Sequence, residues 1–236
     1  VATLFADGQH YDAIIHAAIV GGRRDADDDY RVLYTNLNMF ETLYKYVDQT
    51  DMFINLDSGA SYGRPAPVEE PSPEDFGKVI PGDPYGFSKY IIANRVLDNS
   101  KGVNLRIFGC FGEHEENTRF FNTNINRYID GDPIQLVKNR KMDFIFADDL
   151  YKIIKYYLDG NDGPRDVNCV YDRKYMLSDI AEIINHLGPH KVDIQTEGQY
   201  PTFPYTGKAN NLPIEYDGLA NGIRKVYEKY LCQRNV

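Results

Sequence analysis

The feature of this chain that most limits its fold is the order in which short apolar runs and helical segments follow one another. Apolar runs at residues 11–18, 51–58 and 102–112 have the length of buried strands, and small residues follow or end each of them. Residues 30–47 carry apolar side chains at helical spacing, and residues 84–100 follow an aspartate placed to cap a helix. Strand, helix, strand, helix, strand is the order of a parallel sheet with crossover helices. We therefore predict an α/β fold with a Rossmann-like, doubly wound parallel sheet.

The chain beyond residue 113 is predicted to form a smaller α/β lobe. A proline-rich stretch at 63–84 is too irregular for a regular element, and the sequence shows neither an internal repeat nor a separate flexible linker. We expect residues 1–112 to form most of the sheet and residues 113–236 to form mainly the lobe, with some segments returning to the sheet. The later elements are expected as helices at 118–131, 148–158, 177–187 and 218–231 and as strands at 133–137, 143–146, 166–171 and 191–195.

Composition limits the class of partner. With 42% hydrophobic and 26% charged residues, the chain has the balance of a soluble globular protein. No apolar run approaches the roughly 20 residues of a membrane span, and no signal peptide precedes the first element, so we expect no membrane partner. The net charge of −9 disfavours nucleic acid as a partner. The three cysteines show no C-x-x-C spacing, which predicts no disulfide framework or zinc site and favours the cytoplasm.

Two features have both a functional and an ordinary interpretation. The acidic run "DADDD" at 25–29 is either a cation site or a solvated loop, and it lacks the ligand spacing of a calcium loop. His114 is either a proton-transfer group or a loop histidine, and no carboxylate is placed beside it by spacing along a helix or strand. We expect the ordinary interpretation for both.

A tyrosine and a lysine four residues apart, Tyr85 and Lys89, share one face of the helix predicted at 84–100. Free tyrosine titrates near ~10, so a nearby ammonium would help it to work as an acid or base at neutral pH. Tyr151 and Lys155 have the same spacing, so the spacing alone decides nothing. Ligands of parallel sheets bind at the carboxyl ends of the strands, and Ser58 ends the strand that leads toward Tyr85. The position of Ser58 favours Tyr85 and Lys89 as the catalytic pair.

Five segments in order carry a family resemblance: "IIHAA", "SGASYG", "YGFSK", "NLRIFGCFG" and "DFIFADDL". Together they resemble the extended short-chain dehydrogenase/reductase family, which comprises nucleotide-sugar epimerases, dehydratases and reductases. The resemblance runs through nearly the whole chain, and the turn "AIVGGR" at 18–23 is similar to that of GDP-L-fucose synthases. It implies that residues 1–112 are part of a cofactor-binding Rossmann domain and that residues 113–236 mainly bind substrate.

The resemblance also implies NAD or NADP as cofactor and a Ser-Tyr-Lys active site. Ser58 would hydrogen-bond the reacting oxygen, Tyr85 would pass the proton, and Lys89 would lower the pKa of Tyr85 and hold the nicotinamide ribose. The substrate would be a nucleotide-diphosphate sugar, with Arg119 and Arg140 as phosphate contacts, although either cation is as readily explained as a surface charge. A homodimer would form through the helices at 30–47 and 84–100. The further residues implied at the cofactor are Ala17, Ala18, Asn36, Phe108 and Cys110.

Several positions depart from the family pattern. The sequence has no G-x-x-G-x-x-G turn, and roughly 60 residues of the family fold are missing before residue 1, judged by the size of a βαβ unit. We expect the chain to be a piece of a longer protein, because a sheet without its central strands would expose a long apolar edge. The alternative is a truncated relative that cannot hold its cofactor in the usual way. Gly59 and Ala60 replace the acidic pair of the dehydratases, Ala60 replaces a cysteine acid of the fucose synthases, and Met142 and Gly109 replace a substrate-binding arginine and asparagine.

These departures narrow the expected chemistry to hydride transfer at one carbon. We predict an NAD(P)-dependent nucleotide-sugar oxidoreductase of the 4-keto reductase or 4-epimerase type. The alternative is a non-catalytic member of the same fold that binds a sugar nucleotide or the cofactor. The sequence leaves open which sugar nucleotide binds, whether the enzyme reduces or epimerises, and whether NAD or NADP is used.

Overall fold

The computed structural model describes residues 1–22, 28–64, 67–198 and 202–234. Its centre is a parallel sheet of four strands in the order β1-β2-β3-β7. The predicted α/β class is confirmed, and β7 returns from the second half of the chain to pair with β3. The strands are β1 (Tyr11–His16), β2 (Thr50–Ser58), β3 (Gly102–Ile107) and β7 (Asp166–Cys169).

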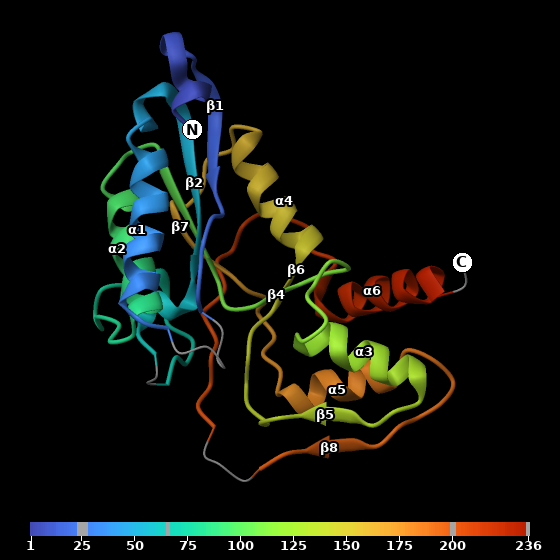
Figure 1. The fold of residues 1–236 in the computed structure, drawn as a ribbon. Coiled ribbons are helices and arrows are strands. Elements are labelled where there is room, and N and C mark those ends of the chain that lie inside the picture. The colour runs from blue at the N-terminus through green and yellow to red at the C-terminus, as the bar shows by residue number, and fades with distance from the viewer. Residues whose placement is uncertain (23–27, 65–66, 199–201, 235–236) are drawn as a thin grey trace.

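Helices cover both faces of this sheet (Figure 1). Side chains alternate between the faces of a strand, so neighbouring residues of β2 pack against different helices. Phe53 packs on one face with side chains of α1 (Tyr30–Tyr44) and α2 (Pro84–Leu97). Ile54 packs on the other face with α4 (Ala147–Leu158). None of the described helices is long and apolar enough to cross a membrane.

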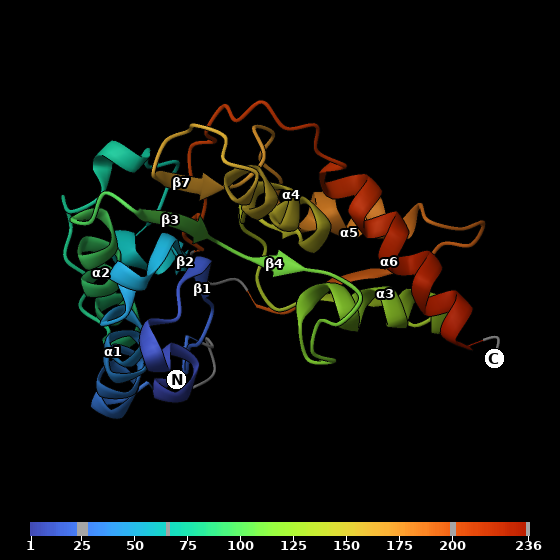
Figure 2. The same cartoon turned by 90° about the horizontal axis from the view of Figure 1, so that it is seen from above.

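A second group of elements packs beside the sheet around its own core (Figure 2). Two short parallel pairs, β4-β6 and β5-β8, belong to it. Its elements are β4 (Cys110–Phe111), α3 (Phe120–Asp130), β5 (Ile134–Leu136), β6 (Ile145–Phe146), α5 (Leu177–Asn185), β8 (Ile194–Thr196) and α6 (Gly218–Arg234). Short 3-10 turns complete the described elements, at Ala2–Gly8, Val47–Gln49, Gly59–Tyr62 and Pro73–Asp75.

Most predicted elements are present, with one correction. The strand predicted at 102–112 is two strands, because the chain leaves the main sheet after Ile107 and β4 pairs with β6 instead. Gly109 lies at this break against Phe144, where a Cβ atom would stand 2.5 Å from the ring. Three predicted segments fall partly outside the described residues: the turn at 18–23, the acidic run at 25–29 and the proline-rich stretch at 63–84.

The start of α2 follows the predicted signals. Asp83 is the N-cap, and its carboxylate accepts a hydrogen bond from the Gly86 amide at 2.8 Å. Pro84 occupies the first turn, where its missing N–H removes no helical bond. This cap fixes where the helix begins, and therefore where Tyr85 lies.

Polar side chains cross the sheet in register on the face that also carries Phe53. His16, Asn55 and Asn104 occupy paired positions on β1, β2 and β3. The His16 ring lies 3.0 Å from the Asn55 amide oxygen, and Asn55 donates to Asn104 at 2.7 Å. Asn104 in turn donates to Asp166 on β7 at 3.0 Å. Each side chain is buried or nearly so, and each finds its partner on the next strand.

One register step further along, Arg106 of β3 has no exposed surface. Its guanidinium donates to Asp57 of β2 at 3.0 Å and pairs with Asp166 at 3.1 Å. Tyr62 accepts another of its hydrogen bonds at 2.8 Å, and the rings of Tyr62 and Phe76 lie within 5 Å of the guanidinium carbon, at 4.4 and 4.7 Å. The buried cation is therefore fully surrounded by groups of the chain itself.

Arg106→Met should lower the free energy of unfolding by about 3–5 kcal/mol, because it leaves Asp57 and Asp166 without the cation beside them. Arg224→Met, an exposed position of α6, is the matched control and should change it by less than about 0.5 kcal/mol. Urea denaturation of the two variants and the parent measures both values. Equal stability of the two variants would show that the buried ion pair does not support the sheet.

Candidate active site

Ser58 ends β2, and the chain then enters the tight turn Gly59–Tyr62. The Ser58 hydroxyl oxygen accepts a hydrogen bond from the Ala60 amide at 3.2 Å. This bond directs the hydroxyl along the carboxyl edge of the sheet, where ligands of parallel sheets bind. The side chain is 9% exposed, so a reacting group would meet it at the surface of the sheet edge.

Tyr85 lies in the first turn of α2 and is half-buried. Burial raises the pKa of its phenol to about 12, while the side chain of Ser58 and the cation of Arg64 act in the opposite direction. Gly22 lies directly against the Tyr85 ring, because a Cβ atom on this glycine would stand 2.5 Å from it. The side-chain hydrogen bond between Tyr85 and Ser58 brings these two residues together at the sheet edge.

Lys89 lies one turn further along α2 and is 3% exposed. Its ammonium donates to the carbonyl oxygen of Leu56 in β2 at 2.6 Å. Burial lowers the pKa of Lys89, and the nearby carboxylate of Asp57 opposes this shift. The lysine is therefore held at the same end of β2 as Ser58, and the expected effect of Lys89 on the pKa of Tyr85 stays a prediction.

Arg64 is a part of this site that the sequence analysis missed. Its guanidinium carbon lies 4.9 Å from the centre of the Tyr85 ring. The same guanidinium donates to the helix cap Asp83 at 3.3 Å and lies 3.8 Å from Asp28. These carboxylates hold the cation over the phenol, which it stabilises in the ionised form. No spacing rule links Arg64 to Tyr85, because the proline-rich stretch separates them.

Asn36 of α1 is buried and fixes the loop that follows β1. It accepts from the Val20 amide at 2.9 Å and donates to the Val20 carbonyl at 3.1 Å. Its second amide hydrogen goes to Ser88 at 3.0 Å, and Ser88 donates to the Tyr85 carbonyl at 2.7 Å. Both amide hydrogens of Asn36 are thus used within the chain, and Asn36 acts on the site by positioning the loop beside Tyr85.

The remaining residues expected at the cofactor differ in accessibility. Ala17 and Ala18 follow β1 directly and are exposed, so their backbone is open to a ligand. Cys110 is exposed in β4. Phe108 is buried against Gly59 and Gly207, where Cβ atoms would stand 2.5 and 2.6 Å from its ring. Phe108 therefore shapes the wall behind Ser58.

Tyr205 reaches the site from the loop before α6, and the sequence analysis missed it as well. Its hydroxyl lies 3.4 Å from the Ser58 hydroxyl. Its ring packs on Phe108 at 5.1 Å between centres. Arg140 also lies next to this ring, with its guanidinium carbon 5.9 Å from the ring centre. Only the tertiary structure brings this loop, 147 residues away in sequence, to Ser58.

The two arginines expected at the substrate differ in setting. Arg140 is half-buried, donates to the Met142 sulfur at 3.3 Å, and has a buried Nε–H with no partner in the described structure. A buried donor without a partner is costly, and a ligand oxygen would satisfy it. Arg119 precedes α3, is exposed, and makes no side-chain cap on that helix.

The second Tyr-Lys pair and His114, which had an ordinary interpretation, lie at the surface. Tyr151 is 61% exposed on α4, and Lys155 pairs with Asp159 rather than with the tyrosine. His114 is exposed, and its ring lies 3.2 Å from the carboxylate of Glu113, a partner that the sequence analysis did not place. Within the described residues, the cysteines are unpaired and no group of three or more metal-binding side chains occurs. Of the acidic run, Asp29 is exposed and accepts from the Arg31 amide, but Asp28 is not solvated as expected: its side chain is 10% exposed, accepts from the Gly22 amide and lies 3.8 Å from Arg64.

Comparison with known proteins identifies what this arrangement is similar to. The sequence model of the NAD dependent epimerase/dehydratase family matches residues 1–169. None of the curated proteins matches the sequence.

Several solved structures share the fold. A UDP-glucuronic acid 4-epimerase from Bacillus cereus, in complex with UDP-glucuronic acid and NAD, is 19% identical, with a TM-score of 0.74 over 99% of this chain and 78% of that one. A UDP-N-acetylglucosamine 4-epimerase from Methanobrevibacter ruminantium, in complex with UDP-N-acetylmuramic acid, is 17% identical, with a TM-score of 0.77 over 95% of this chain and 78% of that one. A GDP-L-fucose synthetase from Naegleria fowleri, bound to NADP, is 13% identical, with a TM-score of 0.69 over 95% of this chain and 78% of that one. At these identities the similarity establishes the fold.

Arg64→Gln should move the ionisation of Tyr85 to higher pH, because it removes a cation that opposes the effect of burial. The ionisation can be followed by NMR of tyrosine labelled with carbon-13 at the Cζ position, with Tyr85→Phe assigning the signal. Arg173→Gln is the matched control, since Arg173 covers Tyr175 at 4.8 Å elsewhere in the molecule. An unchanged Tyr85 titration in Arg64→Gln would show that Arg64 has no electrostatic role there.

Proposed function

We propose that this chain, which belongs to the NAD dependent epimerase/dehydratase family, is a nucleotide-sugar oxidoreductase of the 4-epimerase or 4-keto reductase type. The observation that carries the proposal is the convergence of three polar side chains at one sheet edge. Ser58 ends β2, Tyr85 interacts with its hydroxyl, and Lys89 is held on the same strand through Leu56. The phenol of Tyr85 can donate and accept a proton, and it lies with the hydroxyl of Ser58 and the ammonium of Lys89. These are the groups needed to interconvert an alcohol and a ketone.

The family is NAD-dependent, and the residues present fit the nicotinamide end of such a cofactor. Ala17 and Ala18 expose backbone beside the site, and the loop at Val20–Gly22 lies against Tyr85 with no room for a side chain at Gly22. Lys89 would hold the ribose hydroxyls next to Tyr85. Asn36 would keep the loop in place by its two bonds to Val20. The expectation of NAD or NADP therefore agrees with both the family and the site.

Each side chain has one role in the proposed reaction. Ser58 donates a hydrogen bond to the oxygen on carbon 4 of the sugar, and Tyr85 takes or returns the proton of that oxygen. Arg64 opposes the effect of burial, which raises the pKa of the phenol to about 12, and Lys89 would stabilise the ionised phenol further. When bound, the nicotinamide would accept or supply the hydride at the same carbon.

Dehydration is disfavoured by the residues after Ser58. Gly59 lies against Phe108, where even a Cβ atom would stand 2.5 Å from the ring, so an acidic side chain there would require Phe108 to move. Ala60 has no exposed surface, so a carboxylate in its place would be buried without water. The proton transfers needed to remove water from the sugar thus lack an acid and a base at these two positions.

The proposed substrate is a nucleotide-diphosphate sugar. Arg140 supports this class, because its Nε–H has no partner in the described structure and its guanidinium lies 5.9 Å from the ring of Tyr205, whose hydroxyl is next to Ser58. Arg119 is the second proposed phosphate contact. The 4-epimerases named above were solved with UDP-linked ligands, which makes UDP sugars the first compounds to test.

Tyr85→Phe should lower turnover of a UDP sugar by at least about 100-fold, because it removes the group that moves the proton. The measurement is conversion of UDP-N-acetylglucosamine and UDP-glucuronic acid by the natural protein with NAD. Tyr151→Phe, which changes the exposed tyrosine of the other Tyr-Lys pair, should retain full activity. Undiminished turnover in Tyr85→Phe, with the fold intact by circular dichroism, would refute the assignment and favour a non-catalytic binding protein.

The fate of the hydride separates the two reaction types. An epimerase should return deuterium from carbon 4 to the sugar with no net change in absorbance of the reduced nicotinamide. A reductase should instead consume one reduced nicotinamide for each 4-keto sugar. This measurement needs no prior choice between NAD and NADP.

The proposed homodimer uses α1 and α2, which pack side by side and leave Tyr30 and Tyr34 of α1 exposed by 83% and 73%. Tyr34→Glu should convert a dimer to a monomer in light scattering, because it puts a charge into an apolar interface. Tyr151→Glu on α4 should not change the mass. A monomeric parent protein, or a dimeric Tyr34→Glu, would exclude this interface.

We further propose a cytoplasmic location, in keeping with the unpaired cysteines among the described residues.

A further inference from the structure

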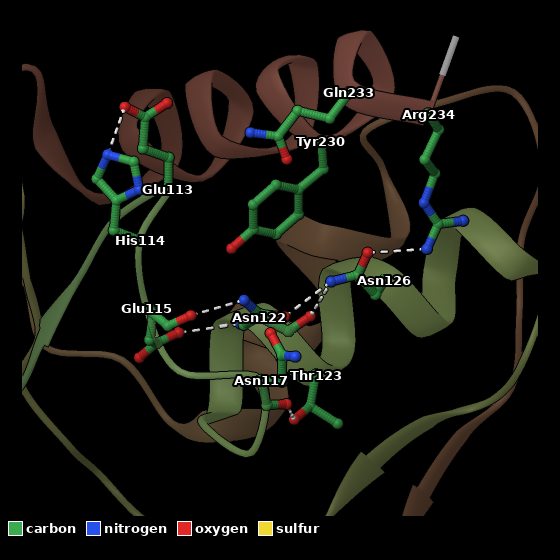
Figure 3. Close-up of a pocket in the computed structure, with 10 residues that line it drawn as sticks. All are labelled: Glu113, His114, Glu115, Asn117, Asn122, Thr123, Asn126, Tyr230, Gln233 and Arg234. Atoms are coloured by element: carbon green, nitrogen blue, oxygen red, sulfur yellow. Dashed lines mark hydrogen bonds and ion pairs between the residues drawn. The ribbon is translucent and has the colours of Figure 1, made fainter. Parts of the chain in front are cut away.

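A cavity of about 790 Å³ opens in the second lobe, away from Ser58 and Tyr85. Its walls are the loop before α3, one face of α3, and the C-terminal part of α6 (Figure 3). Pockets for small molecules commonly span about 300–1,000 Å³, so this cavity is large enough for a molecule of one or two sugar rings. None of the residues of the candidate active site lines it.

Amide side chains dominate the lining of this cavity: Asn117, Asn122, Asn126 and Gln233. An amide offers both donors and acceptors, as a hydroxyl group does. Asn122 and Asn126 bond to each other at 2.8 Å, which fixes their orientation toward the cavity wall. In the described structure, the side-chain amides of Asn117 and Gln233 have no protein partner, and both side chains are exposed. The amide hydrogen bonds of Asn122 and Asn126 are already made within the chain, so, among the described residues of the lining, Asn117 and Gln233 are the amides left free for a ligand.

Tyr230 supplies an independent sign of a ligand. Its side chain extends from α6 toward Glu115 and Asn122 across the cavity (Figure 3). The residue is 5% exposed, and its hydroxyl is buried with no hydrogen-bond partner in the described structure. A buried hydroxyl without a partner is costly to maintain, whereas a ligand hydroxyl at the cavity floor would satisfy it.

The charges of the lining indicate a neutral ligand. Glu113 is paired with Lys229 at 3.2 Å and with His114 at 3.2 Å, and Arg234 is paired with Asp130 outside the lining. Glu115 accepts from the Asn122 amide at 2.9 Å, and burial raises its pKa to about 7. A phosphate would face the carboxylates of Glu113 and Glu115, and a strong cation would compete with Lys229 for Glu113. Hydroxyl groups suffer neither conflict.

We propose that this cavity binds a neutral polyhydroxylated molecule, in chemical terms an unphosphorylated sugar. The site is separate from the proposed active site and takes a ligand that carries no nucleotide. Tyr230 bonds one sugar hydroxyl at the floor, and the amides of Asn117 and Gln233 bond others at the mouth.

The test is a titration of the nitrogen-15-labelled natural protein with methyl α-D-glucopyranoside, followed through the side-chain amide signals of asparagine and glutamine. A saturable shift of the Asn117 and Gln233 signals is the expected result. Tyr230→Phe should weaken binding about fivefold or more, since it removes only the buried hydroxyl. Tyr227→Phe is the matched control on the same helix, outside the cavity, and should bind like the parent. Absence of a saturable shift, or equal affinity of the Tyr230→Phe variant, would overturn the proposal.

Two further comparisons decide the location and the ligand class. Ser58→Ala alters only the proposed active site and should bind the glucoside as the parent does, whereas a loss of binding would mean that the sugar occupies the active site. Glucose 1-phosphate should bind more weakly than the methyl glucoside, because Glu113 and Glu115 face the cavity. Equal or tighter binding of the phosphate would refute the neutral class.

Discussion

The centre of this protein depends on one buried cation. Arg106 has no contact with solvent, and a guanidinium removed from water costs several kcal/mol unless carboxylates and hydrogen bonds surround it. Asp57 and Asp166 supply the charges, so the ion pairs join β2, β3 and β7 in one register. Because Asp57 immediately precedes Ser58, the same ion pair also fixes the strand end that carries the candidate active site. The stability of the sheet and the geometry of the site therefore depend on the same interaction.

The candidate site combines burial with charge. The proposed reaction needs an ionised phenol at Tyr85 and a charged ammonium at Lys89, yet burial acts against the charged form of both. The structure places one further cation and one carbonyl dipole around them: Arg64 covers the phenol, and the Leu56 carbonyl accepts a hydrogen bond from the ammonium. Asn36 holds the neighbouring loop through the Val20 backbone. Neutral hydrogen bonds of Asn36 thus position the loop beside the phenol, and the stacked cation of Arg64 stabilises the ionised form of the phenol.

Much of this could be predicted from local sequence. Apolar runs, helical spacing and the Asp83 cap gave the strands and helices close to their observed bounds, because these signals act over a few residues. The segment 102–112 was predicted as one strand. In the structure it is interrupted at Gly109, which contacts Phe144, a residue 35 positions further along the chain. Arg64 and Tyr205 were missed for the same reason. Each reaches the site from an irregular segment, where no periodicity relates a residue to its neighbours in space.

By itself, the sequence determined the order of the elements. It further determined that Tyr85 and Lys89 share a helix face, since residues four apart in a helix lie on the same face. It also determined that position 59 carries no acid, since that is a matter of residue type alone. Only the tertiary structure decided what surrounds the pair: the cation over Tyr85, the hydroxyl of Tyr205 beside Ser58, and the carboxylates around Arg106. The physical reason is range. Backbone periodicity and capping act within a few residues, whereas burial and charge pairing act on whatever the folded chain brings together.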